Sequence, residues 1–229
     1  YLIFNAARRS EQNKVWAGMA KETAHQIATP LSSLMAWIEL LKDKDGTESM
    51  VFEIEKDIKR LETITDRFSK IGSKPTLEEK NIVELVMDTI TYLKSRLPEK
   101  IQFNILHEKS TIIIPVSTVL LNWVIENICK NAADAMKGKG KITISITEDI
   151  SKVILNIADS GEGIDRSILK NIFKPGVTSK KRGWGLGLSL SKRIVEEYHK
   201  GRIFVMKSEK GVGTTFCIHL PKRLNSTAS

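Results

Sequence analysis

The sequence predicts an α+β protein in two parts, an antiparallel helical hairpin followed by a domain in which helices pack on a sheet. Apolar residues recur at steps of three and four up to about residue 71, whereas strand-like and helix-like stretches alternate after residue 76. Between the two patterns, Gly72-Ser73-Lys74-Pro75 has the composition of a linker. We therefore predict a first domain over residues 1–72, a linker over 73–76, a second domain over 77–221 and a tail over 222–229.

The hairpin prediction rests on two narrow apolar stripes separated by a polar turn that contains Gly46. The first stripe includes Ile27, Leu31, Leu34, Ile38 and Leu41, and the second includes Val51, Ile54, Ile58, Leu61 and Phe68. Such heptad-like stripes are typical of coiled coils and helix bundles. Because two helices alone cannot enclose a core, we expect a homodimer in which two hairpins form a four-helix bundle.

The second domain is expected to be a sandwich of helices on a sheet whose strands mostly pair in sequence order. Helices are predicted from a cap at Asn81 to about Arg96, over 116–136 and over 188–199. Strands are predicted over 101–106, 111–114, 141–147, 152–158, 202–207 and 214–220.

The composition excludes several classes of function. The net charge is +9, but apart from a cluster at 180–182 the basic residues alternate with acids, and no nucleic-acid motif with interleaved aromatics occurs. This pattern favours a solvated surface, or an acidic protein partner, over nucleic acid. Cys129 and Cys217 lie in separate apolar stretches, which predicts buried thiols in a reducing compartment rather than a disulfide or a zinc site.

The chain contains no run of the roughly 18–20 apolar residues that a membrane helix needs. Its first residues join a short apolar stretch to Arg8 and Arg9, which fits either the cytoplasmic exit of a membrane helix or an ordinary helix start. On the first alternative, the whole protein is anchored in the cytoplasmic membrane and the present part faces the cytoplasm.

Three motifs indicate nucleotide chemistry. Asp159 ends an apolar strand and is followed by Gly161, Gly163 and Ile164, so its carboxylate can accept a hydrogen bond from an exocyclic amine such as that of adenine. Taken alone, the same residues also fit a common turn. A second motif, Gly183-Trp184-Gly185-Leu186-Gly187-Leu188, leads into a helix, where backbone N–H groups and the helix dipole favour phosphate. Its spacing differs from the Rossmann fingerprint, and a flexible loop is the alternative.

The third motif is a pair of asparagines, Asn127 and Asn131, which lie four residues apart and therefore share one helix face. Amide oxygens on one face can hold Mg²⁺ together with phosphate oxygens and water. For such a pair in isolation, two polar surface residues is the simpler interpretation. The order of all three motifs along the chain is much more specific than any one of them.

Along the chain, the asparagine pair comes first, then the Asp159 motif, Phe173, the Gly183–Leu188 motif and finally Gly211-Val212-Gly213 followed by Thr214. In this order, the second domain resembles the Bergerat-fold ATP-binding domain of histidine kinases. The resemblance implies ATP as the nucleotide and Asn131 as the Mg²⁺ ligand. It places Asn127 and Asn131 in the N box and Phe173 in the F box. Residues 173–182 would form a mobile lid over the nucleotide.

The remaining motif residues follow from the same resemblance. Asp159, Gly161, Gly163 and Ile164 would lie on the adenine side, and Gly183, Gly185, Leu186, Gly187 and Leu188 on the phosphate side. Asp134 departs from the pattern, because the commonest subfamily has a lysine near this position. Lys130 and Lys174 are the candidates to take the place of this missing lysine at the phosphates.

The position of Asn127 bears on the type of reaction. ATPases that share this fold usually have a glutamate here to activate water, and an amide cannot take a proton. The resemblance therefore favours transfer to an acceptor other than water. Glu126 is adjacent in the sequence but projects about 100° further around the helix.

The acceptor is expected on the first helix. His25 lies two residues from Ile27 of the apolar stripe, so it projects outward, and a neutral imidazole is nucleophilic. Pro30 should kink the helix nearby. The stretch from His25 to Pro30 resembles the H box of histidine kinases, and residues 5–72 resemble their dimerization and phosphotransfer domain. The H box usually has an acid after the histidine; Gln26 occupies that position and cannot act as a base, so Glu22, one turn earlier, is the candidate substitute.

The resemblance implies autophosphorylation of His25 by Mg-ATP and transfer to an aspartate of a response-regulator receiver domain. It also implies that Thr29 could position water for dephosphorylation of the regulator. Two alternatives stay open at this point. One is an ATPase clamp or chaperone of the same nucleotide fold. The other is a dimeric scaffold whose ATP domain is degenerate, an idea that Gln26 supports and the intact glycines and asparagines oppose.

Overall fold

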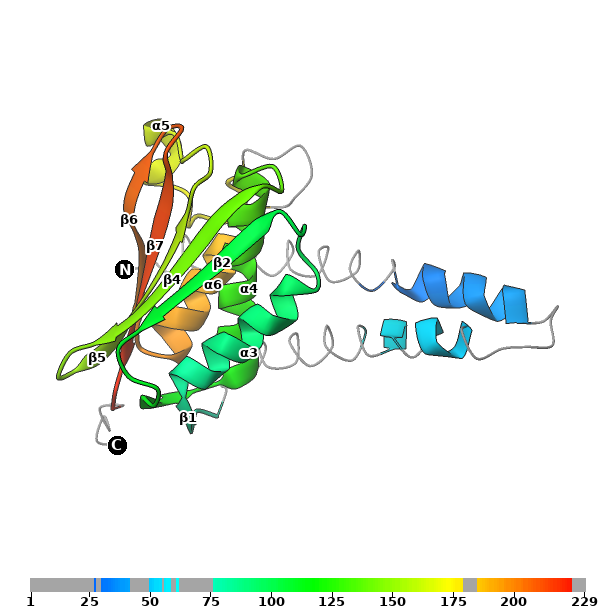
Figure 1. Cartoon of the computed structure of the whole chain (residues 1–229), viewed down its shortest axis with the longest axis horizontal. Helices are drawn as coiled ribbons and strands as arrows, with labels where there is room; N and C mark the ends of the chain where they lie inside the picture. The colour runs from blue at the N-terminus through cyan, green and yellow to red at the C-terminus, as the bar shows by residue number, and fades with distance from the viewer. Residues whose placement is uncertain are drawn as a thin grey trace, which may run out of the picture.

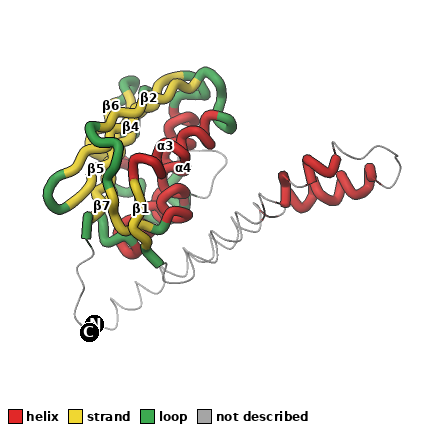
Figure 2. The backbone as a smooth tube through the Cα atoms, turned by 60° about the horizontal axis from the view of Figure 1, so that its bottom comes forward, coloured by secondary structure: helices red, strands yellow, loops and turns green. Residues whose placement is uncertain are grey.

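The computed structural model describes residues 27, 30–41, 50–54, 56–58, 61, 76–178 and 185–223. In the first part, the helical segment 30–41 lies beside the helical residues 50–54 and 56–58 and runs in the opposite direction (Figures 1 and 2). This confirms the predicted hairpin over its described residues. Four residues of the apolar stripes, Leu31, Ile38, Val51 and Ile58, are still 44–51% exposed.

The second part contains two sheets and several helices. Its elements, in chain order, are β1 (Glu78–Asn81), α3 (Ile82–Lys94), β2 (Ile101–His107), β3 (Ile113–Val116), α4 (Thr118–Ala135), β4 (Gly140–Glu148), β5 (Lys152–Asp159), α5 (Arg166–Leu169), α6 (Gly187–Arg193), the π-helix η1 (Ile194–Tyr198), β6 (Arg202–Glu209) and β7 (Gly213–Pro221). Each helix and strand expected from the sequence has a counterpart among them, with ends displaced by a few residues. The short elements β1 and α5 and the π-helical turn are additions to the prediction.

The main sheet has the strand order β2-β4-β5-β7-β6. Neighbouring strands are antiparallel except β2 and β4, which run parallel. The expectation that most strands pair in sequence order was therefore only partly right: β4 pairs with β5 and β6 with β7, but β3 leaves this sheet and pairs with β1. Helices α3, α4 and α6 cover one face of the sheet (Figure 1), and Figure 2 shows the same two layers from another side.

The core lies between the sheet and these helices. Ile142, Ile144 and Ile146 of β4 are completely buried, and they alternate along the strand as the sequence predicts. Leu121 and Ile125 of α4 are equally buried on the opposing layer. Burying one such side chain stabilises the fold by about 1.5–3 kcal/mol, so this layer contact fixes α4, and with it the asparagine pair, over the sheet.

Asn81 caps α3 as predicted. Its Oδ1 accepts hydrogen bonds from the backbone N–H of Val83 at 3.2 Å and of Ile112 at 3.1 Å, and its Nδ2 donates to the Ser110 carbonyl at 3.1 Å. One side chain thus satisfies a free N–H at the helix start and ties the helix to the segment before β3. β3 lies two residues later than the predicted strand, so that Val116 ends a strand and α4 starts at Thr118.

His199 joins α4 to the end of η1. Its Nδ1–H donates to the Ile194 carbonyl at 2.9 Å, and its Nε2 accepts from the Ser117 backbone N–H at 3.0 Å. Because the side chain is almost fully buried, desolvation lowers the pKa of His199 despite both hydrogen bonds. The neutral ring therefore holds the first residue before α4 against the last turn of η1.

Both cysteines are buried and unpaired, as predicted, and burial together with Glu126 raises the pKa of Cys129 to about 12.

None of the helices in the described ranges has the length and apolar character needed to span a bilayer. An anchor upstream of residue 1 stays a prediction.

Candidate functional site

Asp159 is the first anchor of the candidate nucleotide site. It ends β5, and its Oδ1 accepts hydrogen bonds from the backbone N–H of Gly161 at 2.8 Å and of Thr214 at 3.2 Å. Both bonds use Oδ1, so Oδ2 is the oxygen available to accept from a ligand amine. Burial raises the pKa of Asp159, and the two backbone hydrogen bonds oppose that rise. The carboxylate is therefore partly desolvated and held in one orientation, as recognition of an exocyclic amine requires.

The β6–β7 turn closes around this carboxylate from the other side. Gly213 has a φ of 137°, and a Cβ built on it would lie 1.9 Å from the Asp159 carbonyl oxygen, so only glycine fits here. Thr214, the next residue, is buried, and its Oγ1 lies 3.0 Å from Ser208 Oγ. Ser208 Oγ also accepts from the Ile164 backbone N–H at 2.8 Å. The adenine-side residues predicted from the sequence are thus linked into one network.

Asn127 forms the second anchor, on α4. Its Nδ2 donates to Ser191 Oγ of α6 at 2.9 Å, and Ser191 is completely buried. Gly187 begins α6, and a Cβ on it would lie 2.3 Å from Asn127 Oδ1. The lack of a side chain at Gly187 therefore allows α6 to lie directly against the Asn127 amide. The structure brings together the N box and the last glycine of the phosphate-side motif.

The start of α6 is suited to an anion. The residue at its N-cap is Leu186, whose apolar side chain makes no capping hydrogen bond, so the first N–H groups of the helix are not satisfied by a cap. Such N–H groups and the positive end of the helix dipole favour phosphate. Before the helix, Gly176 N–H of the predicted lid donates to the carbonyl of Gly185, a glycine of the phosphate-side motif, at 3.1 Å.

Phe173 lies at the base of that lid and packs on the core. Its ring meets Phe216 of β7 edge to face, with centroids 6.4 Å apart, and Lys192 Nζ of α6 lies 5.8 Å from the ring centroid. Edge-to-face pairs and cation–π contacts are both weakly stabilising. Phe173 therefore attaches the predicted lid to α6 and the sheet, whereas Lys174 is exposed.

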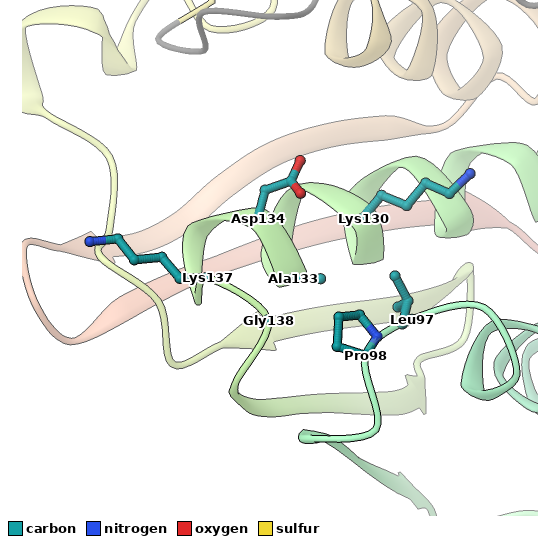
Figure 3. Close-up of a pocket in the computed structure, with 7 residues that line it drawn as sticks. All are labelled: Leu97, Pro98, Lys130, Ala133, Asp134, Lys137 and Gly138. Atoms are coloured by element: carbon teal, nitrogen blue, oxygen red, sulfur yellow. The ribbon is translucent and has the colours of Figure 1, made fainter.

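Lys130 and Asp134 line a cavity of about 530 Å³ at the C-terminal end of α4. Figure 3 shows Leu97 and Pro98 of the turn before β2 facing this end of the helix. The amine of Lys130 forms a 2.6 Å ion pair with Glu126, whose side chain is only 8% exposed. A role for Lys130 at the phosphates would need this pair to open, so that prediction stays untested. Glu126 pairs with Lys130, whereas Asn127 bonds to Ser191 of α6. The two neighbouring side chains thus lie on different faces of α4, as their positions around the helix predict.

Asn131 lies one turn beyond Asn127 on α4 and is half-buried. A single amide oxygen completed by phosphate oxygens and water suits Mg²⁺, which usually keeps several non-protein ligands. Among the residues that the structure describes, no group of three or more His, Cys, Asp or Glu side chains could hold a metal ion by itself. A cation at Asn131 would therefore need phosphate oxygens and water as further ligands, and this role of Asn131 stays a prediction.

Several predicted residues lie outside the described ranges: Glu22, His25, Gln26, Thr29 and Gly183. Sequence reasoning in turn missed Ser191 and Ser208. The signal for Ser191 was a hydroxyl four residues after Gly187, on the same face of a helix that follows a glycine motif. No comparable signal marked Ser208, because its role depends on strand pairing.

Two family models match the chain. Residues 16–74 match the His Kinase A (phospho-acceptor) domain. Residues 117–224 match the family described as histidine kinase-, DNA gyrase B- and HSP90-like ATPase. The first match includes His25, and the second includes both asparagines, Asp159 and the glycine motifs.

Curated relatives match almost the whole chain. Sporulation kinase E of Bacillus subtilis is 34% identical over 227 residues, which cover 96% of this chain and 30% of the kinase. Sporulation kinase D of the same organism is 35% identical over 212 residues, covering 89% of this chain and 41% of that protein. The chain thus spans about 30–41% of the length of these two relatives.

Solved structures show the same fold. The catalytic domain of the histidine kinase ThkA superposes with a TM-score of 0.59 at 27% identity, covering 65% of this chain and 97% of that domain. A structure of ThkA in complex with the response regulator protein TrrA has a TM-score of 0.61 at 24% identity and covers 97% of this chain and 66% of that chain. The second comparison covers both the helical hairpin and the helix-and-sheet domain, and it shows their fold.

Proposed function

Because this chain belongs to the sensor histidine kinases of two-component systems, whose phospho-acceptor and ATP-binding domains it carries in succession, we propose that it uses Mg-ATP to phosphorylate its own His25. One observation carries the proposal: the chain joins a phospho-acceptor domain to a nucleotide site built from Asp159, Asn127 and the start of α6. Both halves of a transfer reaction are then present in one polypeptide.

In the proposed reaction, Nε2 of the neutral His25 imidazole attacks the γ-phosphorus of ATP. A nitrogen–phosphorus bond forms while the bond from phosphorus to the bridging oxygen of ADP breaks, and ADP leaves. The ring proton on Nδ1 is then lost from the phosphorylated imidazolium. Gln26 cannot accept that proton, so Glu22, which precedes Gln26 by four residues in the sequence, or water would take it.

The residues of the second domain act by positioning and electrostatics. Asp159 would fix the adenine amine, and the N–H groups at the start of α6 would stabilise charge on the transferring phosphoryl group. Asn131 would hold Mg²⁺, which neutralises phosphate charge when bound. Asn127, an amide at the position of the ATPase glutamate, cannot activate water, which favours transfer to His25 over hydrolysis.

We propose two partners. The first is a second copy of the chain, because Leu31, Ile38, Val51 and Ile58 leave an apolar surface along the hairpin that a four-helix bundle would bury. The second is a response-regulator receiver domain whose aspartate would accept the phosphoryl group from His25. Thr29 would position water for the reverse task, dephosphorylation of the regulator. Normal regulator phosphatase activity in a Thr29→Ala variant would rule out that role.

The test of the proposed function is incubation with γ-labelled ATP and Mg²⁺. We expect label on the protein that is labile to acid and stable to base, and its complete loss in His25→Ala. His219→Ala, which removes a histidine of the ATP-binding domain, is the matched control and should keep the label. Label that survives in His25→Ala would contradict the assignment of the acceptor. Absence of label in the wild type, despite nucleotide binding, would favour the degenerate scaffold.

A further inference from the structure

Two features of α6 act on the same side chain of α4. Ser191, fully buried, accepts a hydrogen bond from Asn127 Nδ2 at 2.9 Å. One turn earlier on α6, Gly187 leaves no room for a side chain, because a Cβ there would be 2.3 Å from Asn127 Oδ1 and 3.0 Å from its Nδ2. The amide is therefore held from both ends by the helix that begins with the last glycine of the phosphate-side motif.

We propose that Ser191 is a positioning residue, which fixes the Asn127 amide in the orientation that receives the phosphates of Mg-ATP. The inference deepens the proposed function and rests on it for the identity of the ligand. With Nδ2 committed to Ser191, Oδ1 faces the first turn of α6. The hydroxyl thus selects one rotamer of Asn127 before the nucleotide binds, which lowers the ordering cost of binding.

A second bond of the same kind on α4 provides a comparison for the Ser191–Asn127 bond. Thr89 Oγ1 of α3 donates to Asn122 Oδ1 of α4 at 2.8 Å, and the Leu85 carbonyl, 2.7 Å away, is the alternative acceptor for the same proton. This bond also joins a buried hydroxyl to an asparagine of α4, but it lies on the α3 side, away from the glycine motif. Thr89–Asn122 serves helix packing alone. Ser191–Asn127 adds to the same packing a contact with the start of α6.

The proposal predicts a selective effect. Removing the Ser191 hydroxyl leaves the Asn127 amide free to rotate, so interactions at the phosphate end of the nucleotide weaken while those of the adenine end, at Asp159, persist. We expect Ser191→Ala to lower the affinity for a non-hydrolysable ATP analogue with Mg²⁺ about fivefold, the equivalent of one neutral hydrogen bond. The affinity for adenosine should stay within a factor of two of the wild type.

The experiment is isothermal titration calorimetry of the full 229-residue chain with both ligands. The variants are Ser191→Ala, Thr89→Val as the matched control that removes the other buried hydroxyl, Asn127→Ala, and Ser191→Ala combined with Asn127→Ala. Thr89→Val should lower the thermal unfolding midpoint and leave both affinities unchanged. Because Ser191 acts through Asn127, the double variant should bind both ligands as Asn127→Ala does. Ser191→Cys, of nearly the same volume and with a weaker hydrogen-bonding group, serves if the alanine variant does not fold.

Three results would overturn the inference: an unchanged affinity of Ser191→Ala for the Mg-bound analogue, an equal loss for the analogue and adenosine, or a loss in the double variant larger than in Asn127→Ala. None of these measurements requires His25. A wild-type chain that binds the Mg-bound analogue but never labels His25 would therefore contradict the proposed function and still leave the role of Ser191 to be decided by the titrations.

Discussion

The hairpin and the ATP-binding domain differ in how far their apolar residues are buried. In the ATP-binding domain, the isoleucines of β4 and the apolar face of α4 are completely buried between the two layers of one chain. In the hairpin, Met35 and Phe52 are 65% exposed and Leu31 and Ile38 about half exposed. A helix layer over a sheet closes its own core, whereas two helices cannot. The comparison teaches that one chain closes the core of the ATP-binding domain, and it leads us to expect a second copy at the hairpin.

The largest expected effect concerns dimerization through the hairpin. Ile38→Glu combined with Ile58→Glu should convert a dimer to a monomer in analytical ultracentrifugation, because burying each of these side chains is worth about 1.5–3 kcal/mol per chain. The affinity for Mg-ATP should not change. The matched control places the same charges at two similarly exposed residues of the ATP-binding domain, Ile113→Glu with Met206→Glu, and should remain dimeric. A wild type that sediments as a monomer would contradict the comparison.

A second, smaller effect tests the ATP-binding side. Asp159→Asn should weaken nucleotide binding about 10- to 100-fold, since a hydrogen bond to a charged group contributes about 1.5–3 kcal/mol. Calorimetry with Mg-ATP and the stoichiometry of the dimer are the two measurements, and only the first should change. Asp149→Asn is the control, because Asp149 Oδ1 also accepts two backbone N–H bonds, from Ser151 and Lys152, in a turn outside the site. Equal losses in both variants would show that the effect is general destabilisation.

The smallest effect concerns the pH dependence of the ATP-binding domain. The pKa of His199 is lowered in the folded state, so the unfolded chain binds its proton more readily, and unfolding is favoured as pH falls. Its contribution to stability is complete above the unfolded pKa, about 6.5, and is lost as pH decreases through the folded pKa. His199→Gln keeps an acceptor near Ser117 N–H and removes the titration. Denaturant unfolding between pH 5 and 8 should therefore show a flatter profile.

His219 provides the internal check on that profile. Its pKa is also lowered, by burial and by Lys152 and Arg202, but it is far less buried than His199. The residual pH dependence of His199→Gln should decrease further when His219→Gln is added. A profile that His199→Gln leaves as steep as in the wild type would mean that other groups control acid stability.

The sequence predicted the parts of the fold that depend on local pattern. The alternation over Ile142, Ile144 and Ile146 and the cap at Asn81 identify their elements without any long-range information. The pairing of distant segments was harder to predict. No local sequence pattern indicates that β3 pairs with β1, or that β2 runs parallel to β4. In both cases the decisive contacts join residues far apart in the chain.

The site shows the same division. Asp159, Asn127 and the glycines were recognised because their spacing forms a motif. Ser191 was missed because its role depends on the packing of α6 on α4. Lys130 stays an untested candidate for the phosphates, and its amine pairs with Glu126. A lysine four residues after a glutamate on a helix is itself a pattern that predicts such a pair, and it applies here.

The most direct test of the account is a single turnover with limiting γ-labelled ATP, in which ADP, protein-bound label and free phosphate are quantified together. The central claim is that a site with Asn127 in place of a carboxylate transfers the phosphoryl group to His25 instead of to water. The account predicts that ADP and phosphohistidine appear in equal amounts, with free phosphate following much later. Free phosphate that appears as fast as ADP, without label on His25, would contradict it and identify the chain as an ATPase.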